Sequence, residues 1–183
     1  MSKVIAFFCS PRKNGYTAKL MERVLEGAKS AGAEIITYDL NEDGVKGCQG
    51  CFACRSIEGC ATMDILQPMY EDIKSATGII AGFPIYFGAV SGQGKLLLDR
   101  LYPMVGDKFQ PRFPGKKVVT VFAQANPDNS LFTDAMESTH NFFKLCGWEI
   151  LENLLIYGDV ASDFTLPQDL LDRAYEAGKQ LVK

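Results

Sequence analysis

The chain has 183 residues, 47% of them hydrophobic and 22% charged, with a formal net charge of −3 at pH 7. This length fits one globular domain with a sizeable core, and the slight acidity argues against the basic surface of a nucleic-acid-binding protein. No apolar run approaches the ~18 residues of a membrane helix and the start lacks the features of a signal peptide, so we expect a cytoplasmic protein without nucleic-acid or membrane partners.

Short apolar, β-branched runs alternate with longer amphipathic stretches along the chain, which is the pattern of βαβ units. A polar, cysteine-rich stretch at about 41–63 and an irregular stretch at 105–117 interrupt this alternation. In chain order the pattern predicts a strand at Lys3–Phe8, a helix at Tyr16–Ala31, a strand at Glu34–Tyr38, a helix at Leu66–Ser75, a strand at Thr77–Phe83, a helix at Gln93–Met104, a strand at Val118–Ala123, a helix at Leu131–Leu145, a strand at Glu149–Tyr157 and a helix at Pro167–Val182.

Five strands that alternate with five helices predict a parallel sheet with right-handed crossovers. The leading topology is a three-layer, doubly wound α/β fold of the flavodoxin-like kind, with strand order 2-1-3-4-5. We expect one domain over residues 1–183, with the stretch at about 41–63 as an insertion. In such a sheet the ligand lies beyond the carboxyl ends of strands 1 and 3, where the order reverses.

The loop after the first strand, residues 9–17, leads directly into a helix. A phosphate monoester at a helix N-terminus meets free backbone N–H groups and the positive end of the helix dipole. Asn14-Gly15 allows a left-handed turn, which would let the backbone curl around such an anion. The loop also supplies hydroxyl donors and positive charges, at Ser10, Thr17, Arg12 and Lys13.

The loop after the third strand reads Pro84-Ile85-Tyr86-Phe87-Gly88-Ala89-Val90-Ser91-Gly92, and we expect Pro84 to end that strand. Aromatic and small residues of this kind suit the edge of a flat ring. A third polar loop, residues 124–130, lies on the same edge of the predicted sheet. Contact with the ring and a helix cap at Asn129 or Ser130 are both compatible with its sequence.

Together the first two loops resemble those of NADPH-dependent FMN reductases, a flavodoxin-like family whose loops read G-S-P-R-K-N-G-N-T and P-I-Y-[WF]-G-x-x-S-G. Two positions depart from the pattern, because Cys9 replaces a Gly and Tyr16 replaces an Asn. The resemblance implies FMN, with its phosphate on the first loop and its ring on the second. The implied cofactor-binding residues are Ser10, Arg12, Lys13, Asn14, Tyr16, Thr17, Pro84, Ile85, Tyr86, Phe87 and Gly88.

Four cysteines fall within thirteen residues, at spacing C-x2-C-x2-C-x5-C. In a reducing compartment, such cysteines favour metal or redox chemistry over structural disulfides. The spacing and position resemble those of iron–sulfur flavoproteins, and the resemblance implies a [4Fe–4S] cluster. Zinc, two disulfides and no bound centre are the alternatives, although structural zinc usually takes two well-separated C-x2-C pairs. The implied metal ligands are Cys48, Cys51, Cys54 and Cys60.

The resemblance implies an FMN-dependent oxidoreductase that passes electrons from NAD(P)H or ferredoxin through FMN, and through the cluster, to a quinone, a flavin or an oxygen species. Because the flavin carries the reaction, no catalytic acid or base is expected among the side chains. The alternatives are a flavodoxin-like electron carrier without turnover and a zinc-stabilised binding module. A homodimer or homotetramer is expected, and the segment Pro103–Lys116 is either its interface or a self-packed loop.

Overall fold

The computed structural model describes residues 2–158 and 165–183. Five parallel strands form one sheet in the order β2-β1-β3-β5-β6, and a short sixth strand, β4, pairs antiparallel with β3. The strands are β1 Lys3–Phe8, β2 Glu34–Asp39, β3 Gly78–Tyr86, β4 Ala89–Val90, β5 Lys117–Ala123 and β6 Glu149–Ile156. The helices are α1 Tyr16–Ser30, α2 Gln67–Ser75, α3 Gly92–Arg100, α4 Thr133–Leu145 and α5 Gln168–Gln180, with 3-10 turns η1 Ala53–Arg55 and η2 Tyr102–Met104.

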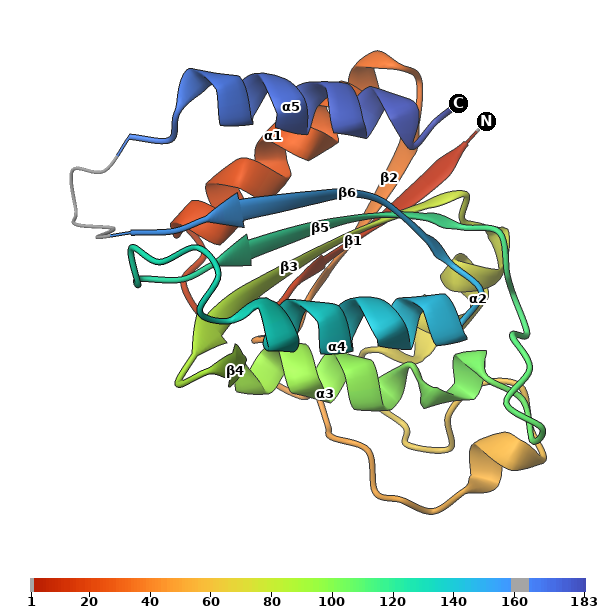
Figure 1. Ribbon diagram of the computed structural model, residues 1–183. Coiled ribbons are helices and arrows are strands. Elements are labelled where there is room, and N and C mark those ends of the chain that lie inside the picture. Colours follow the sequence, from red (N-terminus) through yellow and green to blue (C-terminus); the bar gives the residue numbers. More distant parts are fainter. Residues whose placement is uncertain (1, 159–164) are drawn as a thin grey trace.

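This is the predicted doubly wound fold, with β5 and β6 as the fourth and fifth parallel strands. Helices α1 and α5 cover one face of the sheet, and α2, α3 and α4 lie on the other (Figure 1). Each pair of layers encloses its own hydrophobic core. None of the helices in the described ranges is long and apolar enough to cross a bilayer.

Strand β3 occupies the centre of the sheet, and its sequence is that of a strand covered on both faces. All its residues except Tyr86 are buried. In the neighbouring β1, alternate side chains enter opposite cores: Val4 and Ala6 face α1 and α5, whereas Ile5 and Phe7 face the other layer. The carboxyl ends of β1 and β3 therefore meet at one edge, beside the N-terminus of α1.

Helices α1 and α5 are packed backbone against backbone through two glycines. A Cβ atom on Gly27 would lie 2.0 Å from the carbonyl oxygen of Tyr175, and one on Gly178 would lie 1.9 Å from that of Val24. Only glycine permits so close an approach. The glycine pair thereby sets how α1 lies on the sheet and where its N-terminus stands.

The expectation that Pro84 ends the third strand was wrong, because β3 continues through Pro84 to Tyr86. A proline has no backbone N–H, so it cannot donate the hydrogen bond that a residue in a central strand normally gives to a neighbouring strand. Here β1 pairs with β3 only as far as Gly82, so Pro84 has a neighbour on one side alone, where it lies opposite Ala123 of β5. Beyond it, Ile85 and Tyr86 pair with β4, which was not predicted.

Two helix boundaries also differ from the prediction. Helix α3 ends at Arg100, and the remainder of the expected helix is the 3-10 turn η2. Helix α4 begins at Thr133 after Phe132, so neither Asn129 nor Ser130 is its N-cap. Ser130 is instead held by Asp128, whose Oδ1 accepts from its backbone N–H at 2.9 Å and its hydroxyl at 2.7 Å.

The segment that follows η2 is a self-packed loop. The backbone of Gly106 donates to Gln110 at 2.7 Å, that of Arg112 donates to Met104 at 2.9 Å, and Val105 forms an antiparallel bridge with Pro111. The far end of the segment is fixed by the indole of Trp148, which donates to the carbonyl of Phe113 at 2.9 Å. The segment provides a platform against which the cysteine-rich insertion packs (Figure 1).

The base of the insertion is closed by Arg100, the last residue of α3. Its guanidinium donates to the carbonyl oxygen of Lys46 at 2.6 Å, where the chain enters the insertion. It also donates to the carbonyl oxygen of Thr62 at 3.4 Å, where the chain leaves it. It also forms a two-pronged ion pair with Asp64, with both side chains wholly buried. Its Nε donates to the hydroxyl of Tyr70 at 3.1 Å. One side chain therefore joins both ends of the insertion to the sheet domain.

Burial acts to raise the pKa of the Asp64 carboxyl, but the hydrogen bonds from Arg100 and from two backbone N–H groups outweigh it and hold the pKa below its ordinary value. A carboxyl whose pKa is lower in the folded than in the unfolded state stabilises the fold above the unfolded pKa, near 4. That stabilisation is lost as the pH falls through the lower, folded value.

We therefore expect Arg100→Met to lower the free energy of unfolding by about 3–5 kcal/mol at neutral pH, because it leaves the Asp64 carboxylate buried without its partner. Asp64→Asn should be destabilising at neutral pH and should remove part of the acid dependence below about pH 4. Urea unfolding of the cofactor-free protein across a pH series measures both. The exposed pair Lys179–Glu176 gives the control, since Glu176→Gln should cost less than about 0.5 kcal/mol. If Asp64→Asn and Glu176→Gln lowered the free energy of unfolding equally, the buried pair with Arg100 would not stabilise the fold more than an exposed pair does.

Candidate functional site

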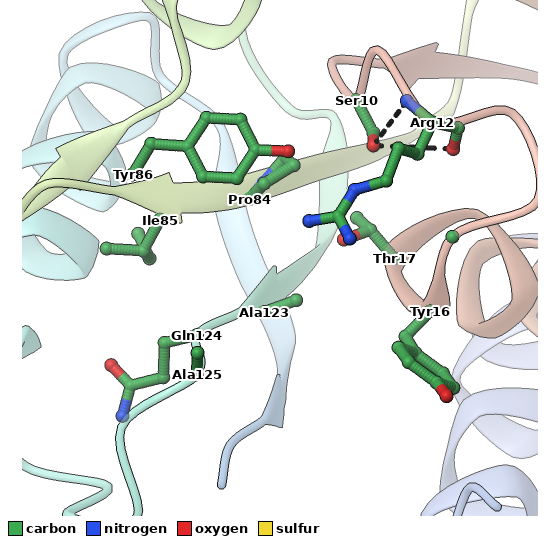
Figure 2. A pocket seen from close by; sticks show the side chains of 11 residues that line it. Ser10, Arg12, Tyr16, Thr17, Pro84, Ile85, Tyr86, Ala123, Gln124 and Ala125 are labelled. Carbon is green, nitrogen blue, oxygen red and sulfur yellow. Dashed lines mark hydrogen bonds between the residues drawn. The ribbon is translucent and has the colours of Figure 1, made fainter. Parts of the chain in front are cut away.

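A cavity opens at the carboxyl edge of the sheet, where β1, β3 and β5 end (Figure 2). This is the edge that the reversal of strand order predicts for a ligand. Three segments that are far apart in the sequence line it: the loop after β1 with the start of α1, the end of β3, and the end of β5 with the residues that follow it. The lining residues are Ser10, Arg12, Gly15, Tyr16 and Thr17, then Pro84, Ile85 and Tyr86, then Ala123, Gln124 and Ala125.

The loop after β1 closes on its own backbone. The carbonyl oxygen of Arg12 accepts from the N–H of Gly15 at 3.0 Å and from the hydroxyl of Ser10 at 3.4 Å, and the Arg12 N–H donates to that hydroxyl at 3.2 Å. The left-handed turn expected at Asn14-Gly15 is not formed, since Gly15 has φ −73° and Asn14 is not among the residues with positive φ. Glycine relieves crowding here instead, because a Cβ would lie 3.2 Å from both Arg12 Cβ and the Arg12 carbonyl oxygen, so the loop would have to shift by a few tenths of an ångström.

This loop delivers the N-terminus of α1 to the cavity. In the described part of the chain no side chain caps the first turn of α1, and that turn contains no acidic residue. Ser10 and Thr17 are buried at the wall, and the guanidinium of Arg12 reaches into the cavity beside Thr17 (Figure 2). Helix dipole, hydroxyls and guanidinium together make this side of the cavity suited to an anion.

The opposite side is formed by the end of β3 and the turn into β4. Phe87 and Gly88 are the two central residues of this hairpin and have positive φ, 51° and 85°, as a type I′ turn requires. Pro84, Ile85 and Tyr86 line the cavity, whereas the turn residues Phe87 and Gly88 do not. The Phe87 side chain is fully exposed.

A buried serine joins the two loops. The Ser91 hydroxyl donates to the carbonyl oxygen of Cys9 at 2.7 Å, and the Ser91 hydroxyl oxygen accepts from the N–H of Gly94 at 3.1 Å. The backbone N–H of Ser91 also donates to the carbonyl of Pro84 at 2.9 Å. The start of α3, the end of β3 and the loop after β1 are thus fixed to one another.

Some predicted residues lie elsewhere. Lys13 turns to the other side of its loop and pairs with Asp39 of β2 at 3.7 Å, and Asn14 does not line the cavity. Tyr16 does line it, while its ring contacts the ammonium of Lys19, 5.1 Å from the ring centre. Cys9 lies outside the cavity wall, fully buried, where burial and the charge of Asp39 raise its thiol pKa.

Gln124 lines the cavity, but it was not predicted as a site residue; the sequence pointed only to the loop 124–130 as a whole. Its side chain is 3% exposed, and its Nε2 donates to the carbonyl oxygen of Asp128 at 2.8 Å. Among residues 2–158 and 165–183 its buried Oε1 has no hydrogen-bond partner, although such an acceptor normally has one. Its position directly after β5, at the predicted ligand edge, was the available signal. The cavity wall therefore holds an acceptor ready for an N–H or O–H donor.

The four cysteines of the insertion line a second cavity, closed on one side by the end of α3 and by η2. Cys54 is buried, Cys60 is partly buried, and Cys48 and Cys51 are exposed. Backbone N–H groups point at two of the sulfurs: Gly50 donates to Cys48 at 3.5 Å and Thr62 to Cys60 at 3.4 Å. The predicted grouping of the four cysteines is thus present as four thiols around one space.

The arrangement does not match a site for a single ion. Within residues 2–158 and 165–183, no three His, Cys, Asp or Glu side chains converge closely enough to hold one metal ion. A four-iron cube holds its thiolate ligands farther apart than one ion does. The donor set and the N–H···S bonds are those that iron–sulfur clusters use.

Comparison with known proteins identifies a family match and several relatives. The family described as NADPH-dependent FMN reductase matches residues 2–153. An iron–sulfur flavoprotein of Methanocaldococcus jannaschii is 29% identical over 158 residues, which cover 86% of this chain and 76% of that protein.

Two solved structures share the fold. An NAD(P)H:quinone oxidoreductase from Methanothermobacter marburgensis superposes with a TM-score of 0.76 at 19% identity, over 98% of this chain and 96% of that one. An FMN-dependent NADH-azoreductase from Bacillus anthracis, solved in complex with FMN, gives 0.66 at 15% identity, over 100% and 98%. With the family match over most of its length, this chain belongs to the NADPH-dependent FMN reductases and is a relative of the iron–sulfur flavoproteins.

Proposed function

We propose that the cavity at the end of β1, β3 and β5 binds FMN, and that the protein passes electrons from NAD(P)H through this flavin to a small acceptor. The observation that carries the proposal is the division of one cavity into an anion-binding side and a flat, largely apolar side. The phosphate lies against Ser10, Arg12 and Thr17 in this proposal, and the ring lies against the segment Pro84–Tyr86. Membership in the FMN reductase family supports it.

Bound FMN supplies the redox chemistry by accepting a hydride from reduced nicotinamide and passing on its electrons. The protein's own residues then have binding and orienting roles. Hydroxyls of Ser10 and Thr17 donate to phosphate oxygens, and Arg12 balances the phosphate charge. Ser91 holds the two loops at a fixed separation, and Gln124 accepts from a donor on the ring or the ribityl chain. In this proposal no side chain acts as a catalytic acid or base.

The acceptor is proposed to be a quinone, a flavin, an oxygen species or a comparable small molecule. The names of the two structural neighbours, a quinone oxidoreductase and an azoreductase, support a small organic acceptor. Ferredoxin is an alternative donor. Rapid bleaching of bound flavin by NADPH or NADH, followed by reoxidation with a quinone, would distinguish the enzyme from an electron carrier without turnover. A flavin that both NADPH and NADH leave oxidised would contradict the proposal.

We further propose that the cysteine cavity holds a [4Fe–4S] cluster on Cys48, Cys51, Cys54 and Cys60. The shared cavity, the N–H···S bonds and the name of the Methanocaldococcus relative support it. The cluster would exchange single electrons with the flavin. Helix α3 separates the two cavities, and its nine residues span about 13 Å. If both centres were bound, electrons would pass between them within one chain or between copies in the homodimer or homotetramer that we expect.

Arg12→Gln should weaken FMN binding by about 10- to 100-fold, because it removes a charge-assisted hydrogen bond to the phosphate. Riboflavin, which has no phosphate, should bind both proteins alike. Isothermal titration with each ligand measures the difference. Lys13→Gln is the matched control, since Lys13 is paired with Asp39 outside the cavity and should matter less. Equal losses for FMN and riboflavin would place the phosphate elsewhere.

Gln124→Met should weaken FMN and riboflavin by the same factor, roughly 5- to 10-fold, because the lost acceptor serves the ring or ribityl chain. The matched control is Asn126→Ala, which disturbs the same loop by removing a 2.9 Å bond to the Asp128 N–H but touches no lining atom. Binding of both ligands is again titrated. If the control loses as much affinity as Gln124→Met, the effect belongs to the loop and not to the acceptor.

Anaerobic reconstitution with iron and sulfide should load the wild type with a cluster, measured by iron and sulfide content and visible absorption. Cys51→Ser should abolish the cluster while FMN still binds. Cys146→Ala changes a buried cysteine outside the cavity and should leave the iron content unchanged. Stoichiometric zinc in place of iron in anaerobically purified protein would refute the cluster.

A further inference from the structure

Two arginines exchange hydrogen bonds between the cysteine loop and the platform that follows η2. Arg55, in the cysteine loop, donates to the carbonyl oxygens of Tyr102 at 3.1 Å and Gly106 at 2.5 Å. Arg112, in the platform, donates back to the carbonyl oxygens of Cys54 and Ile57, both at 2.8 Å. As mechanical ties the two arginines are equivalent, since each joins the same two segments by two bonds to carbonyl oxygens.

They differ in what else they reach. Nη2 of Arg55 lies 3.9 Å from the sulfur of Cys54, the buried cysteine of the four. The guanidinium also stacks over the ring of Tyr102 at 4.0 Å, which holds it directly behind the cavity wall. Within the described part of the chain, the hydrogen bonds of Arg112 end on carbonyl oxygens. Of these two arginines, Arg55 is therefore the one that contacts a cysteine sulfur.

The charge of Arg55 is also uncompensated. Around the cysteine cavity, Asp99 is paired with Lys95 at 2.6 Å, and Arg100 is paired with Asp64. Among residues 2–158 and 165–183, no carboxylate lies within ion-pair distance of Arg55, and its buried Nε has no hydrogen-bond partner. A lone cation in a partly buried position acts strongly on whatever charge forms beside it.

We propose that Arg55 is a positioning residue that raises the reduction potential of the cluster by donating an N–H to Cys54 Sγ and placing its positive charge beside that ligand. The proposal rests on the proposed cluster. When the cluster takes one electron, from 2+ to 1+, the cluster and its thiolates gain one negative charge. A cation and an N–H donor stabilise this reduced form more than the oxidised one, so they raise the potential. A raised potential favours the passage of electrons from reduced flavin to the cluster.

The test compares Arg55→Met with Arg112→Met in reconstituted, anaerobic protein. Each variant breaks one tie of two carbonyl bonds, but only Arg55→Met removes the contact with sulfur. Titration with dithionite, followed by the electron paramagnetic resonance of the reduced cluster, gives the potential. We expect Arg55→Met to shift the equilibrium toward the oxidised form by roughly tenfold, about 59 mV for one electron. Arg112→Met should shift it by less than a third as much, and the FMN potential should stay constant in both.

If Arg55→Met fails to hold iron, Arg55→Gln carries the test, because it keeps an N–H donor, loses the charge and is still expected to lower the potential. Equal potentials in the wild type and the Arg55 variants, with full iron content, would overturn the role of Arg55 alone. Equal shifts in the Arg55 and Arg112 variants would show that loosening of the loop, not the sulfur contact, sets the potential. A wild type that binds no iron after reconstitution would overturn the cluster itself and this proposal with it.

Discussion

Strand β3 pairs with β1 although β2 precedes it in the chain, and this one pairing brings the parts of the proposed flavin site together. The ladder continues past the end of β1, where the N–H of Cys9 donates to the carbonyl of Gly82 at 3.1 Å. From there the chain after β1 turns toward α1 and the chain after β3 turns toward α3, so a cleft opens between them. Ser91 then fixes its width through the carbonyl of Cys9. An anion side and a ring side in one cavity follow from this arrangement.

Helix α3 links that cavity to the cysteine cavity. Its first turn is tied to the flavin loops through Ser91 and Gly94, and its last residue, Arg100, carries the base of the insertion. The two candidate redox sites are thus mounted on the two ends of one short, rigid element. Helix α3 thus connects the segments that form the two cavities, although most of the cysteine cavity itself is lined by the insertion loop.

The fold was predictable because the alternation of buried strands and amphipathic helices is a local property of the sequence. The grouping of Ser10, Arg12 and Thr17 with Pro84–Tyr86 followed from topology plus family resemblance. What the sequence did not reveal depends on distant partners. Lys13 is drawn aside by Asp39 of the neighbouring strand, and Pro84 is accommodated because β1 stops short. The unpartnered oxygen of Gln124 and the contacts of Arg55 likewise arise from segments that only folding brings together.

The clasp made by Arg100 has a consequence for how such proteins diversify. Because it joins the carbonyl oxygens of Lys46 and Thr62, the residues between them form a cassette whose two ends are bridged by one side chain, with Asp64 and Gln67 adding a further bond at each end. Side chains at these two ends can be exchanged without removing the bonds to Arg100, because Arg100 binds backbone carbonyl oxygens that every residue type supplies. A lineage can in this way gain, lose or replace an inorganic centre while it keeps its flavin domain, and a designer can transplant the cassette by moving Arg100 and Asp64 along with it.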